Sequence, residues 1–171
     1  GADPFQREAY DRVMQLKGRP LHQTPLLLIP DRAWVSILAR QVSSLAVKVM
    51  DAFWPGPLTI VFEASREAPS WLLRDDETIA LRCSSHPWVQ SFLGRYEKPI
   101  ISTSANLSGC SSARSIDEVR KMFGPSVDFY ADGGTLPGSK SSTIVSLTHS
   151  NIHLLRDGDI SLDQLKKFAH G

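Results

Sequence analysis

The sequence predicts a single domain of the α/β class. Short apolar runs alternate with helical stretches along the whole chain, which is typical of strands and helices that share one layered core. The 171 residues suffice for one domain with a sizeable core. No internal repeat, low-complexity tract or long linker divides them, so we expect one unit over residues 1–171.

The first predicted helix begins close to the first residue. Asp3 is a suitable N-cap, Pro4 fits the first helical position, and Gln6 completes a capping-box pattern. Gly18 and Pro20 are expected to end this helix. Its apolar face would consist of Phe5, Ala9, Val13 and Leu16.

Three strands and a second helix are expected in the following segment. Apolar runs predict strands over residues 26–29, 58–62 and 78–82. A helical pattern covers residues 37–53 and ends before Pro55-Gly56-Pro57, because proline cannot continue a helix.

Three further helices and four strands are expected after residue 83. His86-Pro87 is typical of a helix start and Gly94 of its end, and four apolar residues between them should be buried: Trp88, Val89, Phe92 and Leu93. Capping-box pairs predict the other two helices, one before Gly124 and one near the C-terminal end: Ser115 with Glu118, and Ser161 with Gln164. The strands are expected over residues 99–103, 127–130, 143–147 and 152–155.

The most informative motif is the run of small polar residues that follows the strand at 99–103. Ser102, Thr103, Ser104 and Asn106 offer hydrogen-bond donors and acceptors without bulk or charge. A sheet delivers such groups to the mouth of a cleft at the end of a strand, where they suit a nucleotide or an amino acid. An ordinary turn is the alternative, since Ser, Asn and Gly are common turn residues.

A second motif, Lys17-Gly18-Arg19-Pro20, follows directly on the first helix. Since Gly18 and Pro20 end the helix, Lys17 and Arg19 are expected on a stiff, non-helical corner where they can hold one polyanion between them. Alternatively, the two cations complement the helix dipole.

Charge, cysteines and hydropathy limit the function classes. The formal net charge of +1 gives no overall attraction to nucleic acid or membrane. Cations outnumber anions between Arg12 and Lys48, which indicates either a local anion site or a solvated basic face. Cys83 and Cys110 lie in no metal-type spacing, so no metal ligands are expected and a reduced cytoplasmic setting is the default. No apolar run approaches the roughly 20 residues of a membrane span.

Together, the two motifs resemble one family. Lys17-x-Arg19 followed by Ser104-x-Asn106 is similar to the pairing in the YrdC-like family of threonylcarbamoyl-AMP synthases. Further segments resemble the family in the same order: residues 1–4, 53–59, 78–82, 86–87, 132–134, 142–145 and 154–158. The resemblance implies a twisted mixed sheet flanked by helices around a large cleft.

The resemblance also implies an activity. The family joins L-threonine, bicarbonate and ATP into threonylcarbamoyl-AMP and releases pyrophosphate. The product feeds the threonylcarbamoyladenosine modification of tRNA, so tRNA and tRNA-modification proteins are the partners expected downstream. Mg²⁺ is expected to accompany ATP, without a dedicated carboxylate site.

Site residues carry over by position. Lys17 and Arg19 would be catalytic by holding the ATP phosphates and the developing charge of pyrophosphate. The other ATP contacts implied are Thr78, Ser104, Asn106 and Arg156. Arg82 ends an apolar strand and would pair with the threonine carboxylate. Ser102 and Ser142 would hold the amino or hydroxyl group of threonine.

The chain departs from the family pattern at three places. The strand and helix that normally precede Asp3-Pro4 are missing from the sequence. Two acidic residues of the family pattern are absent from 140–146, and Asp157 stands where the family often has proline. The segment after Pro20 is one residue longer. The changes at 140–146 and 157 concern the amino-acid end of the cleft.

Three alternatives stay open. Carbamoyl-transfer relatives used in hydrogenase maturation share the fold and handle a carbamoyl-adenylate. A non-enzymatic RNA-binding module would use the basic segment between Arg12 and Lys48. A relative that binds nucleotide without turnover would be consistent with the missing N-terminal segment.

Overall fold

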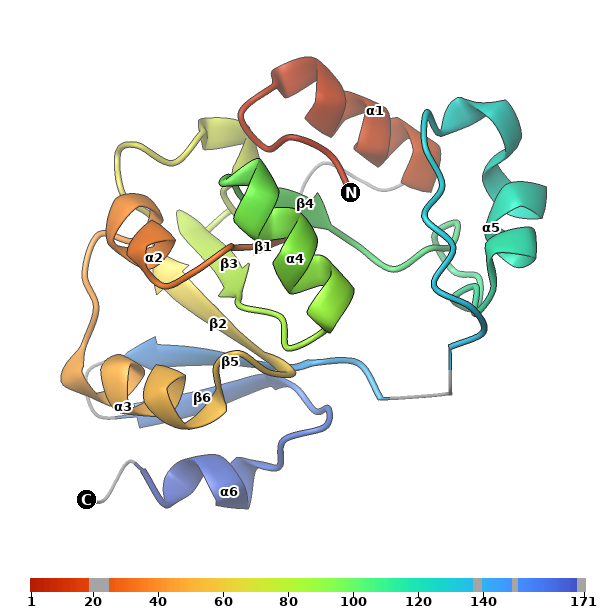
Figure 1. The fold of residues 1–171 in the computed structure, drawn as a ribbon. Coiled ribbons are helices and arrows are strands. Elements are labelled where there is room, and N and C mark those ends of the chain that lie inside the picture. Colours follow the sequence, from red (N-terminus) through yellow and green to blue (C-terminus); the bar gives the residue numbers. More distant parts are fainter. Residues whose placement is uncertain (19–24, 137–139, 149–150, 169–171) are drawn as a thin grey trace.

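The computed structural model describes residues 1–18, 25–136, 140–148 and 151–168 (Figure 1). The strands are β1 (Leu26–Leu28), β2 (Leu58–Glu63), β3 (Thr78–Arg82), β4 (Ile100–Ser102), β5 (Thr143–Thr148) and β6 (Asn151–Arg156). The helices are α1 (Arg7–Lys17), α2 (Ala33–Leu38), α3 (Ser44–Phe53), α4 (Pro87–Tyr96), α5 (Ile116–Phe123) and α6 (Leu162–Lys166). Two short 3₁₀ turns, η1 (Ser70–Leu72) and η2 (Gly124–Ser126), complete the order.

The strands form one six-stranded mixed sheet in the order β4-β1-β3-β2-β5-β6. The β1/β3 and β2/β5 pairs are parallel, and the other neighbours are antiparallel. The predicted α/β class and mixed sheet are therefore confirmed. Figure 1 shows α5 beside α1, set apart from the strands.

The core lies on one face of this sheet. Residues that alternate along the strands are fully buried there, among them Leu27, Ile60, Leu81 and Ile101. They pack in one cluster with residues of α1, α2, α3 and α6. Burying this apolar surface is the main stabilising contribution to the fold.

The first helix begins later than predicted. Asp3 Oδ1 accepts a hydrogen bond from the Phe5 N–H at 2.9 Å, so Asp3 caps a turn and α1 starts at Arg7. The buried face also differs, since it consists of Tyr10, Met14 and Lys17. Gly18 ends the helix as predicted, in the left-handed conformation at φ 58°.

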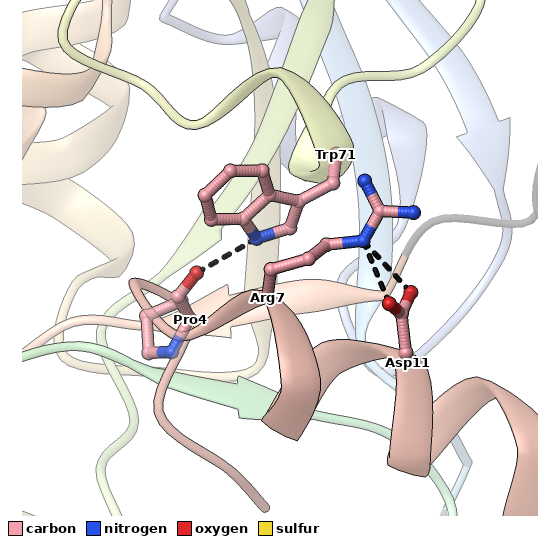
Figure 2. Close-up of polar contacts among 4 residues, drawn as sticks. All are labelled: Pro4, Arg7, Asp11 and Trp71. Carbon is pink, nitrogen blue, oxygen red and sulfur yellow. Dashed lines mark hydrogen bonds and ion pairs between the residues drawn. The ribbon is translucent and has the colours of Figure 1, made fainter.

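The N-terminal segment is anchored by a tryptophan from η1 (Figure 2). Trp71 Nε1 donates to the Pro4 carbonyl at 3.0 Å, and the Arg7 guanidinium lies 5.9 Å from the centre of the Trp71 ring. Arg7 also pairs with Asp11 at 2.9 Å, one turn further along α1. Since both side chains of this ion pair are about half exposed, the pair adds little, and the partly buried indole hydrogen bond is the more important anchor.

The long helix predicted over residues 37–53 is wrong, because the chain forms α2 and α3 with a break between them. At the break, Arg40 N–H donates to the Glu63 carbonyl at 2.8 Å, and Ala39 forms a β-bridge with Ala64. Ser43 then caps α3 by accepting from the Ala46 N–H at 3.1 Å. Pairing with the end of β2 therefore overrides the helical pattern.

Two expectations about α4 are also wrong. Gly94 lies inside the helix, which continues to Tyr96 and ends with Glu97 in the left-handed conformation. Trp88 and Phe92 are 52% and 39% exposed, and their rings stack on each other at 5.4 Å between centroids. Of the four apolar residues expected inside, Leu93 is the buried one.

The strand predicted over residues 127–130 is absent, since this segment is irregular. Asp128 pairs instead with Arg12 of α1 at 2.8 Å, and Tyr130 Oη donates to the Gly124 carbonyl. Phe129 is 78% exposed, so the apolar side chains of this segment are not buried against the sheet.

The caps predicted for α5 and α6 are present at Ser115 and Ser161, and of these two helices α6 has the full capping box.

No helix in the described ranges is long and apolar enough to cross a membrane.

Candidate functional site

The predicted site residues that belong to strands lie on the sheet face opposite to the core. Thr78 and Arg82 alternate with the buried Ile79 and Leu81 along β3, so they point away from the core cluster. The residue pairs between neighbouring strands show which other side chains share this face. Leu28 pairs with Arg82 and Leu26 pairs with Ser102.

The same face continues across β2, β5 and β6. Ile144 pairs with Thr59 on one side and with Arg156 on the other. Directly paired residues share a face, so Thr59 and Arg156 belong together. We call this surface the polar face, defined by Thr59, Thr78, Arg82, Ser102 and Arg156.

Lys17 joins Ser104 and Asn106 in the first of two clusters, although it lies almost ninety residues before them in sequence. Lys17 Nζ donates to the Ser104 carbonyl at 2.5 Å and to Asn106 Oδ1 at 2.8 Å. Ser104 Oγ donates to the same Asn106 oxygen at 2.6 Å, and Asn106 Nδ2 donates to the Cys110 carbonyl at 2.5 Å. Both amide atoms of Asn106 are therefore fixed, and with them the orientation of the loop.

Lys17 is 4% exposed, so its ammonium lies beneath the surface. This position differs from the non-helical corner expected from the sequence. Lys17 is the last residue of α1, and its own carbonyl accepts from the Ser108 N–H at 3.0 Å. The end of α1 is thus tied to the Ser104–Ser108 loop by main chain and side chain together, and it brings a positive charge to the loop.

Arg82, Arg156 and Ser142 belong to the second cluster. Arg82 Nε donates to the Gly56 carbonyl at 2.9 Å, and Gly56 N–H donates to the Cys83 carbonyl at 2.8 Å. Arg156 donates to the Ser142 carbonyl through Nε at 3.1 Å and Nη2 at 2.8 Å, and Nη2 also reaches Ser142 Oγ at 3.0 Å. Thr59 Oγ1 lies 3.0 Å from the same Ser142 hydroxyl.

The electrostatics of this cluster favour an anion. Burial lowers the pKa of the Arg82 guanidinium below its ordinary value; Asp159 opposes the shift, and the nearby Arg156 adds to it. Burial also lowers the pKa of Arg156. Arginine remains charged at neutral pH in any protein site, so two partly desolvated cations stand close together. A bound carboxylate or phosphate would offset both the burial of the two charges and the repulsion between them.

Gly158 packs directly against the segment that carries Ser142. A Cβ atom at this position would lie 2.2 Å from the Ser141 carbonyl oxygen and 2.4 Å from the Thr143 nitrogen. Thr143 Oγ1 holds the same loop by donating to the Ile160 carbonyl at 2.7 Å and accepting from the Ile160 N–H at 2.9 Å. The chain after β6 therefore fixes the backbone at Ser142.

We expect Gly158→Ala to lower the free energy of unfolding by about 1–3 kcal/mol, because backbone atoms must shift to admit the methyl group. The melting temperature should fall by roughly 2–12 °C. Gly94→Ala is the matched control, since no heavy atom lies within 4 Å of its added Cβ and the site is helical. It should be neutral or raise the stability by up to about 1 kcal/mol. Equal melting temperatures for both variants in calorimetry would contradict this account.

The remaining predicted residues are placed less closely. Thr78 Oγ1 donates to Asp76 Oδ1 at 2.5 Å and contacts neither cluster through a described hydrogen bond. Ser102 is half-buried on the polar face. Arg19 lies outside the described residues. The ligand roles assigned to all these residues stay predictions.

One residue of the second cluster escaped the sequence analysis. It is Thr59, whose buried hydroxyl lies 3.0 Å from that of Ser142, 83 positions away. Thr103 belongs to the polar motif named above, and its Oγ1 is the one buried side-chain polar atom in the described part of the chain without a hydrogen-bond partner. Thr59 lies in the Pro57-Leu58-Thr59 segment that resembles the family, which was the one available signal.

A cavity of about 330 Å³ lies beside the Gly56 turn, lined by the end of α3 and by Gln164 of α6. Its lining includes Trp54, Gly56, Ser85 and Gln164 and contains no charged side chain. None of the residues predicted to bind ATP belongs to this lining. The described residues also contain no group of three or more His, Cys, Asp or Glu side chains that could hold a metal ion.

Comparison with known proteins identifies the family. The family model Sua5_yciO_yrdC, described as telomere recombination, matches residues 1–158. The chain belongs to this family. It is 37% identical over 129 residues to the threonylcarbamoyl-AMP synthase of Yersinia pestis, a match that covers 74% of this chain and 68% of that protein.

Solved structures of the Sua5/YciO/YrdC family have the same fold. The P. abyssi Sua5 structure complexed with L-threonine superposes with a TM-score of 0.91 at 30% identity, over 98% of this chain and 49% of that one. E. coli YciO superposes with a TM-score of 0.85 at 25% identity, over 95% of this chain and 79% of the other. The chain thus spans about half the length of the P. abyssi Sua5 chain.

Proposed function

We propose that this chain is a threonylcarbamoyl-AMP synthase, which joins L-threonine, bicarbonate and ATP and releases pyrophosphate. The observation that carries the proposal is the pair of basic clusters, one with a single buried ammonium and one with two guanidinium groups. The reaction has two anionic reactants to position, a polyphosphate and an amino acid carboxylate. The names of the related proteins support this assignment.

The Lys17 cluster suits the phosphates of ATP. An ammonium is a compact charge that can approach several phosphate oxygens, and Ser104 and Asn106 add neutral hydrogen-bonding groups beside it. Arg19 follows two residues later in the sequence and would supply a second cation. In this role Lys17 and Arg19 are the catalytic groups, because they stabilise the negative charge that grows on the departing pyrophosphate.

The Arg82 cluster suits L-threonine. Among the described residues none accepts a hydrogen bond from the two Nη groups of Arg82, so they remain able to form a bidentate pair with the threonine carboxylate. Ser102 and Ser142 would provide the neutral contacts to the amino acid. Thr78 and Arg156 would reach ATP from the polar face, and Arg156 would also organise Ser142.

The proposed chemistry depends mainly on positioning. The threonine amino group combines with bicarbonate to form a carbamate with loss of water. A carbamate oxygen then attacks the α-phosphate and pyrophosphate leaves. Holding both reactants in line contributes much of such a rate enhancement without a dedicated general base. The described residues form no metal cluster, so Mg²⁺ would be held chiefly by the phosphates of ATP.

The product is a reactive mixed anhydride. The proposal includes its use in the cytoplasm by tRNA-modification proteins, which transfer the threonylcarbamoyl group to tRNA.

The RNA-binding alternative has lost support, because two of the cations that motivated it have anionic partners. Arg12 pairs with Asp128 and Arg32 pairs with Asp51. Lys17 is buried. The described part of the basic segment is therefore not a continuous exposed cationic face.

Product identification tests the proposal. The chain is incubated with L-threonine, ¹³C-bicarbonate and Mg-ATP, and the adenylate is analysed by mass spectrometry. We expect threonylcarbamoyl-AMP that carries one ¹³C atom. ATP binding without this product would favour the relative that lacks turnover. RNA binding with a steep salt dependence and no product would favour the RNA-binding module.

A further inference from the structure

Thr59 carries a buried hydroxyl group that has one hydrogen-bond partner among the described residues. The side chain lies in β2 on the polar face and is 0% exposed. Its Oγ1 is 3.0 Å from Ser142 Oγ, and no other hydrogen bond of this hydroxyl is found among the described residues. A threonine in the middle of a buried strand offers no packing advantage over valine, so the hydroxyl calls for an explanation.

The direction of the Thr59–Ser142 hydrogen bond follows from counting donors and acceptors. A hydroxyl has one proton and two lone pairs. Arg156 has only donors, so its bond to Ser142 Oγ at 3.0 Å occupies one Ser142 lone pair. The buried Thr59 proton needs an acceptor, and Ser142 Oγ is the acceptor within reach. Thr59 therefore donates and occupies the second lone pair.

We propose that Thr59 is a positioning residue that makes the Ser142 hydroxyl a hydrogen-bond donor to an oxygen of the amino acid substrate. With both lone pairs occupied, Ser142 cannot accept from the ammonium group of an amino acid. Its proton is left for a carboxylate or hydroxyl oxygen. This inference rests on the proposed function, and it narrows the role of Ser142 from amino or hydroxyl binding to oxygen binding.

The surroundings of Ser142 keep this arrangement rigid. The Arg156 guanidinium holds the Ser142 carbonyl, and the Thr143–Ile160 hydrogen bonds fix the next residue. Gly158 packs directly against the backbone of the same segment. The hydroxyl polarity is therefore set by Thr59 and Arg156 together, and loss of Thr59 would free one Ser142 lone pair and let its proton turn away from the substrate.

The test compares Thr59→Val, which removes the hydroxyl at nearly constant shape, with Thr59→Ser, which keeps it. Binding of L-threonine and of ATP to the whole chain is measured by calorimetry, along with the melting temperature. We expect Thr59→Val to weaken L-threonine binding roughly tenfold, with ATP binding changed less than about twofold. Thr59→Ser should bind L-threonine nearly as the wild type does.

Ser43→Ala is the control for general destabilisation, since it removes a hydroxyl that caps α3. It should lower the melting temperature without changing L-threonine binding. The inference would be overturned if Thr59→Val lost affinity for L-threonine and ATP by the same factor, or if its L-threonine binding were unchanged. It would also be overturned if Thr59→Ser weakened L-threonine binding as much as Thr59→Val does, or if the wild type did not bind L-threonine. L-threonine binding without pyrophosphate release by the wild type contradicts only the proposed function.

A second amino acid distinguishes the two possible oxygens. L-2-aminobutyrate has the carboxylate of threonine and lacks its hydroxyl. If Thr59→Val weakens binding of both amino acids equally, Ser142 donates to the carboxylate. If only L-threonine binding is weakened, Ser142 donates to the hydroxyl and contributes to substrate specificity. Both results agree with the proposed donor role.

Discussion

Arg82→Ala is expected to raise the KM for L-threonine by roughly 10- to 150-fold, with the KM for ATP changed less than about twofold. A hydrogen bond to a charged group contributes about 1.5–3 kcal/mol, and every 1.4 kcal/mol corresponds to a factor of ten. Arg82 is anchored through Nε to the Gly56 carbonyl, which leaves its Nη groups for the substrate. Steady-state pyrophosphate release, with each substrate varied in turn, provides the two KM values.

Two further variants make the Arg82 prediction specific. Arg82→Lys keeps the charge and loses the planar fork, so its KM for L-threonine should lie between those of the wild type and Arg82→Ala. Arg66→Ala removes an exposed arginine and should leave both KM values unchanged. A rise of both KM values by the same factor in Arg82→Ala would contradict a threonine-binding role and indicate general damage to the sheet.

Lys17→Ala should reduce the rate of pyrophosphate release by at least two orders of magnitude. Loss of one charged donor from a preorganised site has an effect of about 10²–10³ on turnover. The substitution also leaves the Ser104 carbonyl and Asn106 Oδ1 without their Lys17 donor, so some loss of stability is expected as well. Pyrophosphate release should therefore be compared at a temperature where the variant is folded.

Lys17→Met separates the charge from the packing. Methionine retains most of the apolar stem and lacks the ammonium, so the melting temperature should fall less than in Lys17→Ala while turnover is lost to the same extent. Lys98→Ala, at an exposed position, should retain full activity. Turnover of Lys17→Met near the wild-type rate would show that the ammonium has no catalytic role.

Local patterns predicted the elements whose causes are local. β3 was predicted at residues 78–82 because its short apolar run is visible in the sequence. The α6 cap was predicted because Ser161 and Gln164 bond each other within one turn. The prediction of one helix over 37–53 was wrong because the backbone N–H of Arg40 donates to the backbone carbonyl of Glu63. This contact joins residues far apart in sequence, so no local pattern indicates it.

The candidate site followed the same rule. Lys17, Ser104 and Asn106 were predicted together only through the family resemblance, since their hydrogen bonds join residues 87 and 89 positions apart. The burial of Lys17 was missed, although it falls on the same helical stripe as Tyr10 and Met14. No local pattern singled out Thr59, because an apolar strand gives no sign that one of its hydroxyls lies against a serine 83 positions away.

Pyrophosphate release by the wild-type chain, with Mg-ATP and bicarbonate and with or without L-threonine, tests the proposed function most directly. We expect release that requires both L-threonine and bicarbonate and that Lys17→Ala abolishes. Threonine-independent release, or no release from a folded chain that still binds ATP, would contradict a threonylcarbamoyl-AMP synthase activity for this chain.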